Sequence, residues 1–162
     1  MSLPAADFKQ RKQALLLACA NAQSLPRASQ VRKHLRQLSL LCDDSLLGLW
    51  RLADMPEQAC LVAVGGYGRQ ALFPYSDVDV LVLLSDGLSP QDNPDLQTAI
   101  ERFIGSCWDA GLEIGSSVRN LQECIVEAAS DITVQTSMLE ARCIVGDAAL
   151  FKDFSQGFHK HL

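Results

Sequence analysis

Hydrophobic residues recur at intervals of three and four along the first third of the chain, which is the spacing of one face of an α-helix. The repeat covers residues 5–22 and residues 28–53, and Ser24-Leu25-Pro26 interrupts it. The positions that carry the repeat are Phe8, Leu15, Cys19, Val31, Leu35, Leu38, Leu41, Leu46 and Leu49. We therefore predict an N-terminal helical extension over residues 1–55.

The hydrophobic pattern changes after residue 55. Two short apolar runs, Cys60–Val64 and Val78–Leu84, have the length and composition of buried strands. The segments that follow read as a helix at 95–109, an extended segment at 112–119, helices at 121–129 and 131–140, a short apolar stretch at 143–145 and a final helix. Residues 56–162 are therefore predicted to form an α+β (or α/β) domain with a small mixed sheet flanked by helices.

A glycine pair, Gly65-Gly66, ends the first predicted strand. Glycine has no Cβ, so the backbone at such a turn can come close to a ligand and adopt unusual dihedral angles. Backbone N–H groups beside a helix N-terminus can hold a phosphate, and Tyr67–Gln70 is predicted to be that first helical turn. The turn is a candidate phosphate site.

Two carboxylates, Asp77 and Asp79, open the second predicted strand. Side chains two residues apart in a strand point to the same face, with α-carbons roughly 6.5 Å apart. Carboxylates this close repel each other unless a cation lies between them, and Mg²⁺ prefers such oxygen ligands together with substrate phosphates. The alternative is a plain turn between two strands, with solvated acids at a strand end.

The charge distribution narrows the classes of partner. The 162-residue chain has a net charge of −5, but residues 1–59 carry eight Lys/Arg and five Asp/Glu, whereas residues 60–162 carry six and fourteen. A strongly acidic half argues against general nucleic-acid binding and is compatible with a magnesium–nucleotide complex.

The remaining composition indicates an ordinary globular protein of one domain. No pair of the six cysteines has zinc-ligand spacing, so we expect buried free thiols in a reducing cytoplasm. The sequence shows no signal peptide and no apolar run long enough to span a membrane.

The combination of the glycine pair with Asp-hydrophobic-Asp-hydrophobic matches the signature of the polymerase-beta-like nucleotidyltransferase superfamily. More closely, "AVGGYGR" and "LFPYSDVDVLVLL" resemble the catalytic domain of the bifunctional uridylyltransferase/uridylyl-removing enzymes that act on the PII signal protein. "CWDAGLEIGSSVRNLQEC" (107–124) and "DITVQTSMLEARCIVGDAALF" (131–151) are similar to later stretches of those enzymes. The likeness covers about residues 60–151.

The resemblance implies roles for several residues. Gly65 and Gly66 are expected to contact the nucleotide triphosphate, and Asp77 and Asp79 to bind two Mg²⁺ ions, for which Mn²⁺ is a possible substitute. Ser76 is expected either to bond a phosphate oxygen or to cap the turn.

Three further charged residues are open to two interpretations each. Arg69 is placed to steady a phosphate or to pair with a local acid. Glu113 is the candidate for the third catalytic carboxylate common in the superfamily, or else an exposed strand residue. Arg119 is a phosphate or partner contact, or part of a surface ion pair.

The resemblance also implies an activity: transfer of UMP from UTP, favoured over ATP, to a PII-type signal protein in a larger nitrogen-signalling enzyme. Ala71 and Ser116 depart from the family, which usually has Glu and His there. The alternatives are a non-catalytic nucleotide-binding regulatory module and a stand-alone minimal nucleotidyltransferase of a toxin–antitoxin-like pair. Because the resembling enzymes continue into further domains, we expect the chain to be a fragment.

Overall fold

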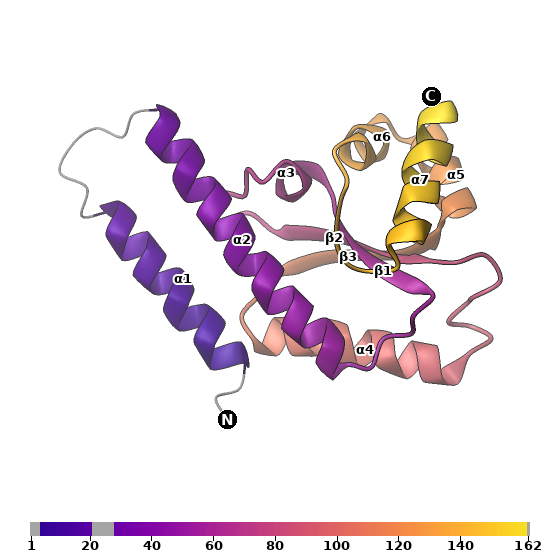
Figure 1. Cartoon of the computed structure of the whole chain (residues 1–162), viewed down its shortest axis with the longest axis horizontal. Coiled ribbons are helices and arrows are strands. Elements are labelled where there is room, and N and C mark those ends of the chain that lie inside the picture. Colours follow the sequence, from indigo (N-terminus) through magenta and orange to yellow (C-terminus); the bar gives the residue numbers. More distant parts are fainter. Residues whose placement is uncertain (1–3, 21–27, 162) are drawn as a thin grey trace.

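The computed structural model describes residues 4–20 and 28–161, and these residues form seven helices and four strands (Figure 1). Two helices come first, α1 (Pro4–Ala20) and α2 (Ala28–Leu52), and lie side by side. The elements that follow are β1 (Ala59–Ala63), α3 (Gly65–Gly68), β2 (Val78–Leu84), α4 (Pro94–Asp109), β3 (Ile114–Asn120), α5 (Leu121–Ser130), α6 (Ile132–Leu139), β4 (Arg142–Gly146) and α7 (Ala148–Lys160). The end of the first predicted helix, residues 21–22, lies outside the described residues.

The four strands form one mixed sheet in the order β3-β2-β1-β4. Strand β1 pairs antiparallel with both β2 and β4, and β2 pairs parallel with β3. The helix α4 makes the long connection that two parallel strands require. The predicted α+β class with a small mixed sheet is therefore confirmed, and the apolar stretch at 143–145 proves to be an edge strand.

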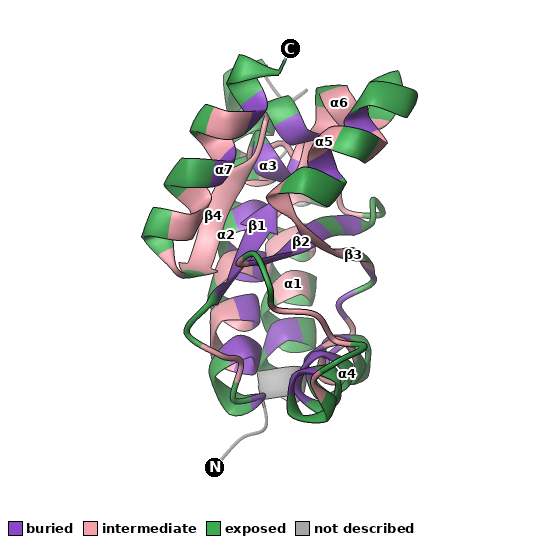
Figure 2. Ribbon diagram, turned by 90° about the vertical axis from the view of Figure 1, so that its right-hand side faces the viewer, coloured by how far each residue is buried: buried purple, intermediate pink, exposed green. Residues whose placement is uncertain are grey.

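Helices cover both faces of the sheet (Figures 1 and 2). Alternate residues of β2 serve the two sides, as the period of a strand requires. Val80 and Val82 belong to the core shared with α2 and α4. Leu81 and Leu83 pack with Met138 and other residues of α5, α6 and α7. Odd-numbered positions of β2 therefore face α5–α7, and this is the side on which Asp79 is expected.

The N-terminal helices share a core with the sheet. Phe8 of α1 and Leu46 of α2 are buried in the same cluster as Val80. The rings of Trp50 in α2 and Phe103 in α4 meet edge to face, with centroids 5.3 Å apart, which is a favourable aromatic geometry. The helical extension is thus part of the structure that supports the sheet.

Capping residues fix where α5 and α6 begin. Asn120 accepts a hydrogen bond from the backbone N–H of Glu123, and Glu123 accepts one from the N–H of Asn120, each at 2.9 Å. Asp131 accepts from the N–H of Thr133 at 2.8 Å. Such caps satisfy N–H groups that have no partner within the helix. Asp131 is the residue that ends α5 and also caps α6, so the two helices follow each other directly.

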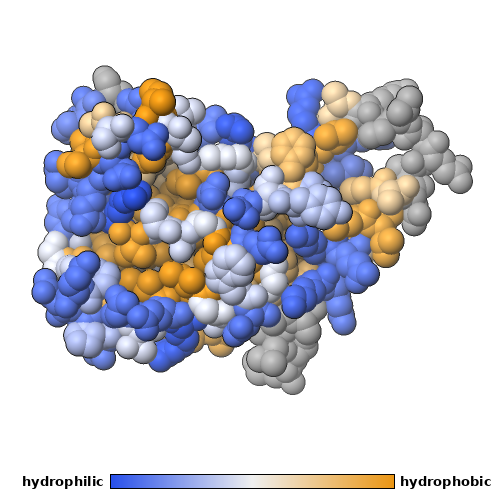
Figure 3. Space-filling view, turned by 180° about the vertical axis from the view of Figure 1, so that it is seen from behind, coloured by the Kyte–Doolittle hydropathy of each residue, from blue (hydrophilic) through white to orange (hydrophobic). Residues whose placement is uncertain are grey.

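The edge strand β3 lies at the back of the molecule in the view of Figure 1 (Figure 2). From that side, hydrophobic side chains form a band between hydrophilic ones (Figure 3). Val118 of β3 lines two surface grooves, one with Ile104 and one with Val126.

Among the helices that the structure describes, none has the length and apolar character needed to cross a membrane.

Candidate functional site

The pairing of β1 with β2 brings the glycine turn to Asp79. Ala63 is paired with Val80, and the backbone N–H of Val64 donates to the carbonyl oxygen of Asp79 at 3.1 Å. The chain then leaves the sheet at Gly65. A Cβ on Gly65 would lie only 3.8 Å from Oδ2 of Asp79. The turn and the acid, 14 positions apart in sequence, are therefore neighbours in space.

The three glycines of this turn, Gly65, Gly66 and Gly68, are required for different physical reasons. Gly65 has φ +60°, a conformation that side-chain-bearing residues rarely adopt. Gly68 is packed so closely that a Cβ would lie 2.2 Å from the carbonyl oxygen of Glu140. Gly66 has neither constraint, because its Cβ would meet ordinary contacts at 3.7 Å. Backbone conformation therefore explains the glycine at position 65, and close packing explains the one at position 68. Neither reason explains why position 66 is a glycine.

The helix α3 begins at Gly65, two residues before the predicted start at Tyr67. The two glycines themselves form the first turn, with Val64 in extended conformation before them. The first N–H groups of a helix have no partner within it, so those of the glycine pair are suited to an anion.

Asp77 and Asp79 are both exposed, and β2 begins between them at Val78, so Asp77 lies just before the strand. The pKa of Asp79 is raised, first by partial burial and then by the negative charge of Asp77. The negative charge of Asp77 therefore acts on Asp79, two residues along the chain. A cation between them would offset the repulsion, and two carboxylates are a donor set that Mg²⁺ accepts.

A strand glycine makes room for the acid on its other side. Gly115 of β3 is paired with Asp79, and a Cβ there would lie 2.7 Å from Oδ1 of Asp79. Asp79 thus lies between two residues without side chains, Gly65 and Gly115. Our sequence analysis missed Gly115, although an isolated glycine in a strand is a known sign of close approach.

The two arginines of interest both pair with acids. Arg69 forms an ion pair with Glu140, and Arg119 approaches Glu127 at 3.6 Å. The partner of Arg69 is 71 residues away, so it is not the local acid that was expected. The phosphate contacts of both arginines stay predictions. A phosphate contact would require the side chain to leave its present partner.

Ser76 and Glu113 do not line the cavity that begins at Asp79. They line a separate cavity of about 120 Å³, together with Tyr75. Within residues 4–20 and 28–161 there is no group of three His, Cys, Asp or Glu side chains placed to hold a metal ion. The roles assigned to Ser76 and Glu113 stay predictions.

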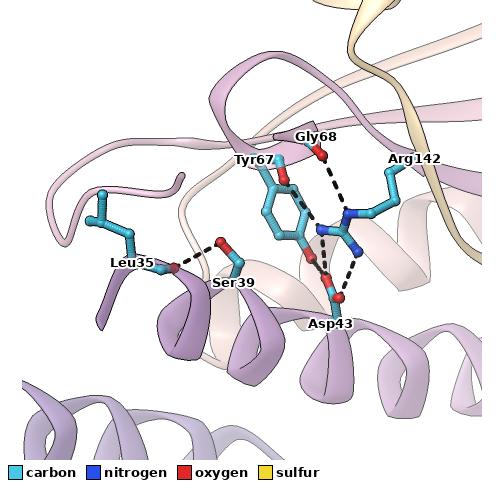
Figure 4. Close-up of polar contacts among 6 residues, drawn as sticks. All are labelled: Leu35, Ser39, Asp43, Tyr67, Gly68 and Arg142. Atoms are coloured by element: carbon cyan, nitrogen blue, oxygen red, sulfur yellow. Dashed lines mark hydrogen bonds and ion pairs between the residues drawn. The ribbon is translucent and has the colours of Figure 1, made fainter. Parts of the chain in front are cut away.

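A polar network holds the glycine turn from behind (Figure 4). Asp43 of α2 accepts a hydrogen bond from the hydroxyl of Tyr67 at 2.5 Å and two from Arg142 of β4, at 2.6 and 3.1 Å. Arg142 also donates to the carbonyl oxygens of Tyr67 and Gly68, at 3.2 and 3.4 Å. Two elements that are distant in sequence, α2 and β4, are thus tied to α3.

This network is largely shielded from solvent. The Tyr67 ring is 1% exposed, and Arg142 lies over it with its guanidinium carbon 5.2 Å from the ring centre. Burial and the adjacent Asp43 raise the pKa of Tyr67 above its ordinary range, so its hydroxyl stays protonated and donates. The sequence offered no signal for the network, because its members are 24 and 75 residues apart.

No protein-family model matches the chain. Several curated relatives are described as bifunctional uridylyltransferase/uridylyl-removing enzymes. The chain is 50% identical to that of Burkholderia lata over 157 residues, 49% to that of Burkholderia orbicola over 157, and 48% to that of Burkholderia vietnamiensis over 155. These alignments cover 96–97% of the chain. The chain is a homologue of these uridylyltransferases.

The shared stretch is a small part of the uridylyltransferases. The chain spans about 17% of the length of the curated relatives it matches. Ala71 and Ser116, the two positions where the resemblance led us to expect other residues, both lie near the site. The N–H of Ala71 donates to the carbonyl oxygen of Gly66 at 2.9 Å, and Ser116 lines a cavity that begins at Asp79.

Proposed function

We propose that this chain is a magnesium-dependent nucleotidyltransferase unit, which transfers UMP from UTP to a protein hydroxyl. The observation that supports it best is the position of Asp79 between the glycine turn and Gly115. A phosphate on the turn and a cation on the acid pair would be adjacent there. The printed names of the relatives favour a uridylyl group.

The proposed roles follow from the arrangement of the chain. The N–H groups of Gly65 and Gly66 bind the phosphates, and Asp77 and Asp79 hold two Mg²⁺ ions, which Mn²⁺ can replace. Bound metal supplies charge neutralisation of the leaving phosphates and activation of the acceptor hydroxyl. The acceptor oxygen forms a bond to the α-phosphorus, and the bond to the bridging oxygen breaks. Pyrophosphate leaves with that electron pair, and the hydroxyl proton passes to solvent.

The proposed acceptor is a tyrosine of a PII-type signal protein. The chain itself would be one part of a larger nitrogen-signalling enzyme. This assignment comes from the family resemblance. A second candidate is a nucleotide-binding regulatory module without catalysis. It is favoured by one observation: the described residues do not bring a third carboxylate to Asp77 and Asp79.

One experiment separates these candidates. The chain is incubated with Mg²⁺, labelled UTP or ATP, and a PII-type protein, while calorimetry records nucleotide binding with and without EDTA. Magnesium-dependent UTP binding with label on the acceptor supports the transferase. Binding without label supports the regulatory module. No magnesium-dependent binding of either nucleotide contradicts both.

Gly66→Val is expected to weaken triphosphate binding by about tenfold or more, while the fold is retained. The added side chain has room within the protein, since its Cβ would lie 3.7 Å from the nearest atoms, but it projects where the phosphates are proposed to lie. Calorimetry with Mg-UTP measures the loss. Gly105→Val in α4 is the matched control, because a Cβ there has no atom within 4 Å and therefore no clash either. Equal affinity in the two variants would show that phosphates do not approach Gly66.

A further inference from the structure

A cavity of about 360 Å³ begins at Asp79 and runs between the sheet and α6. Its volume is in the range of small-molecule sites. The sheet side includes Asp79, Leu81, Gly115, Ser117 and Arg119, and the helical side includes Asp131, Thr133, Val134, Ser137 and Met138. The lining thus combines apolar side chains and several hydroxyl groups with three charged side chains, those of Asp79, Arg119 and Asp131. Apolar side chains suit the faces of a nucleobase, and hydroxyl groups suit the polar edges of a base and the oxygens of a ribose.

Ser137 of α6 stands where this cavity meets the glycine turn. A Cβ on Gly65 would lie 3.2 Å from the hydroxyl oxygen of Ser137 and 3.8 Å from Oδ2 of Asp79. The hydroxyl, the acid and the turn therefore converge on one point from three elements. Ser137 is partly exposed, so a ligand at this point can reach its hydroxyl group.

The hydroxyl of Ser137 is available to a ligand. Helical Ser and Thr commonly donate to a carbonyl one turn earlier, and the neighbouring Thr136 does so, to Ile132 at 2.8 Å. Within the part of the chain that the structure describes, Ser137 makes no side-chain hydrogen bond of this kind. Its polar group is directed toward the space beside Gly65.

We propose that the cavity between β3 and α6 binds the nucleoside end of the nucleotide, and that Ser137 contacts the substrate where nucleoside and phosphates join. This inference rests on the proposed function, since it takes the triphosphate to lie on the glycine turn. With the phosphates there, the cavity offers the nucleoside space along β3, from Gly115 to Arg119.

The test compares two ligands, Mg-UTP and Mg-tripolyphosphate, which differ by the nucleoside. Ser117→Phe fills the cavity from the sheet side and is expected to weaken UTP binding at least tenfold, with tripolyphosphate affinity changed by less than about twofold. Ser137→Ala is expected to weaken UTP binding about three- to tenfold. Thr136→Ala, one residue away with its hydroxyl already bonded, is the matched control and should leave UTP affinity unchanged.

Thermal unfolding of each variant verifies that the fold is retained. Equal loss for both ligands in folded Ser117→Phe, or no loss for either, would overturn the assignment of the cavity. Equal UTP affinity in Ser137→Ala and Thr136→Ala would remove Ser137 from the contact. Neither result would contradict the proposed function, which fails if the parent chain binds Mg-UTP no better than metal-free UTP.

Discussion

Asp79→Asn is expected to abolish magnesium-dependent nucleotide binding, with affinity for Mg-UTP reduced by about a hundredfold or more. The substitution keeps the shape of the side chain but removes the charge that a metal ligand needs. It also removes the acid that the structure places beside the glycine turn. Calorimetry with Mg-UTP measures the effect.

The same variant should not lose stability. The pKa of Asp79 is raised in the folded protein, by burial first and by Asp77 second. Its contribution to stability is therefore complete below the pKa of an unfolded carboxyl and declines as pH rises through the raised value. Asn has no such decline, so Asp79→Asn should unfold at an equal or slightly higher temperature near neutral pH.

Asp86→Asn is the control for this prediction. Asp86 is an exposed acid just beyond the other end of β2, far along the strand from the glycine turn. It should bind Mg-UTP like the parent chain. If Asp79→Asn also binds like the parent, the metal site does not include Asp79.

Asp43→Ala is expected to destabilise the fold by about 2–4 kcal/mol, because it leaves two groups without their partner. The guanidinium of Arg142 loses its bidentate carboxylate, and the hydroxyl of Tyr67 loses its acceptor. The side chains of Arg142 and Asp43 are only 24% and 19% exposed, so water replaces the lost bonds poorly. Urea unfolding measures the free energy.

Asp44→Ala is the matched control in the next position of the same helix. Asp44 is 68% exposed and lies 3.7 Å from Arg11, an arrangement that contributes at most about 1 kcal/mol. A loss in Asp43→Ala no larger than in Asp44→Ala would show that the network does not stabilise the fold. A second expectation is weaker Mg-UTP binding in Asp43→Ala, since Tyr67 belongs to the glycine turn.

Local patterns predict much of this fold from sequence. Hydrophobic periodicity located α2 and α4, and a short apolar run located β2. The helices α5 and α6 begin where they were expected, after Asn120 and at Asp131. These features depend on neighbours within about four residues, and such neighbours are visible in the sequence. Element ends were less accurate: β3 begins at Ile114 rather than 112.

Contacts between distant segments were not predictable in this way. The acid pair and the glycine pair are visible as motifs, but the positions of Gly115 and Ser137 beside them follow from strand register and from the packing of α6. The bonds of Asp43 to Arg142 span 99 residues. A single sequence contains no record of which distant residues will meet, since that depends on how the whole chain packs.

The two glycines that flank Asp79 have an evolutionary consequence. Gly115 is small because the carboxylate of Asp79 occupies the space where its Cβ would lie. The requirement at one position is thus set by the residue at the other, and selection on the pair should act jointly. Homologous chains that have lost the acid at position 79 should be free to carry a larger residue at position 115. In chains that keep the acid, a side chain at 115 should be accompanied by a compensating shift of β3.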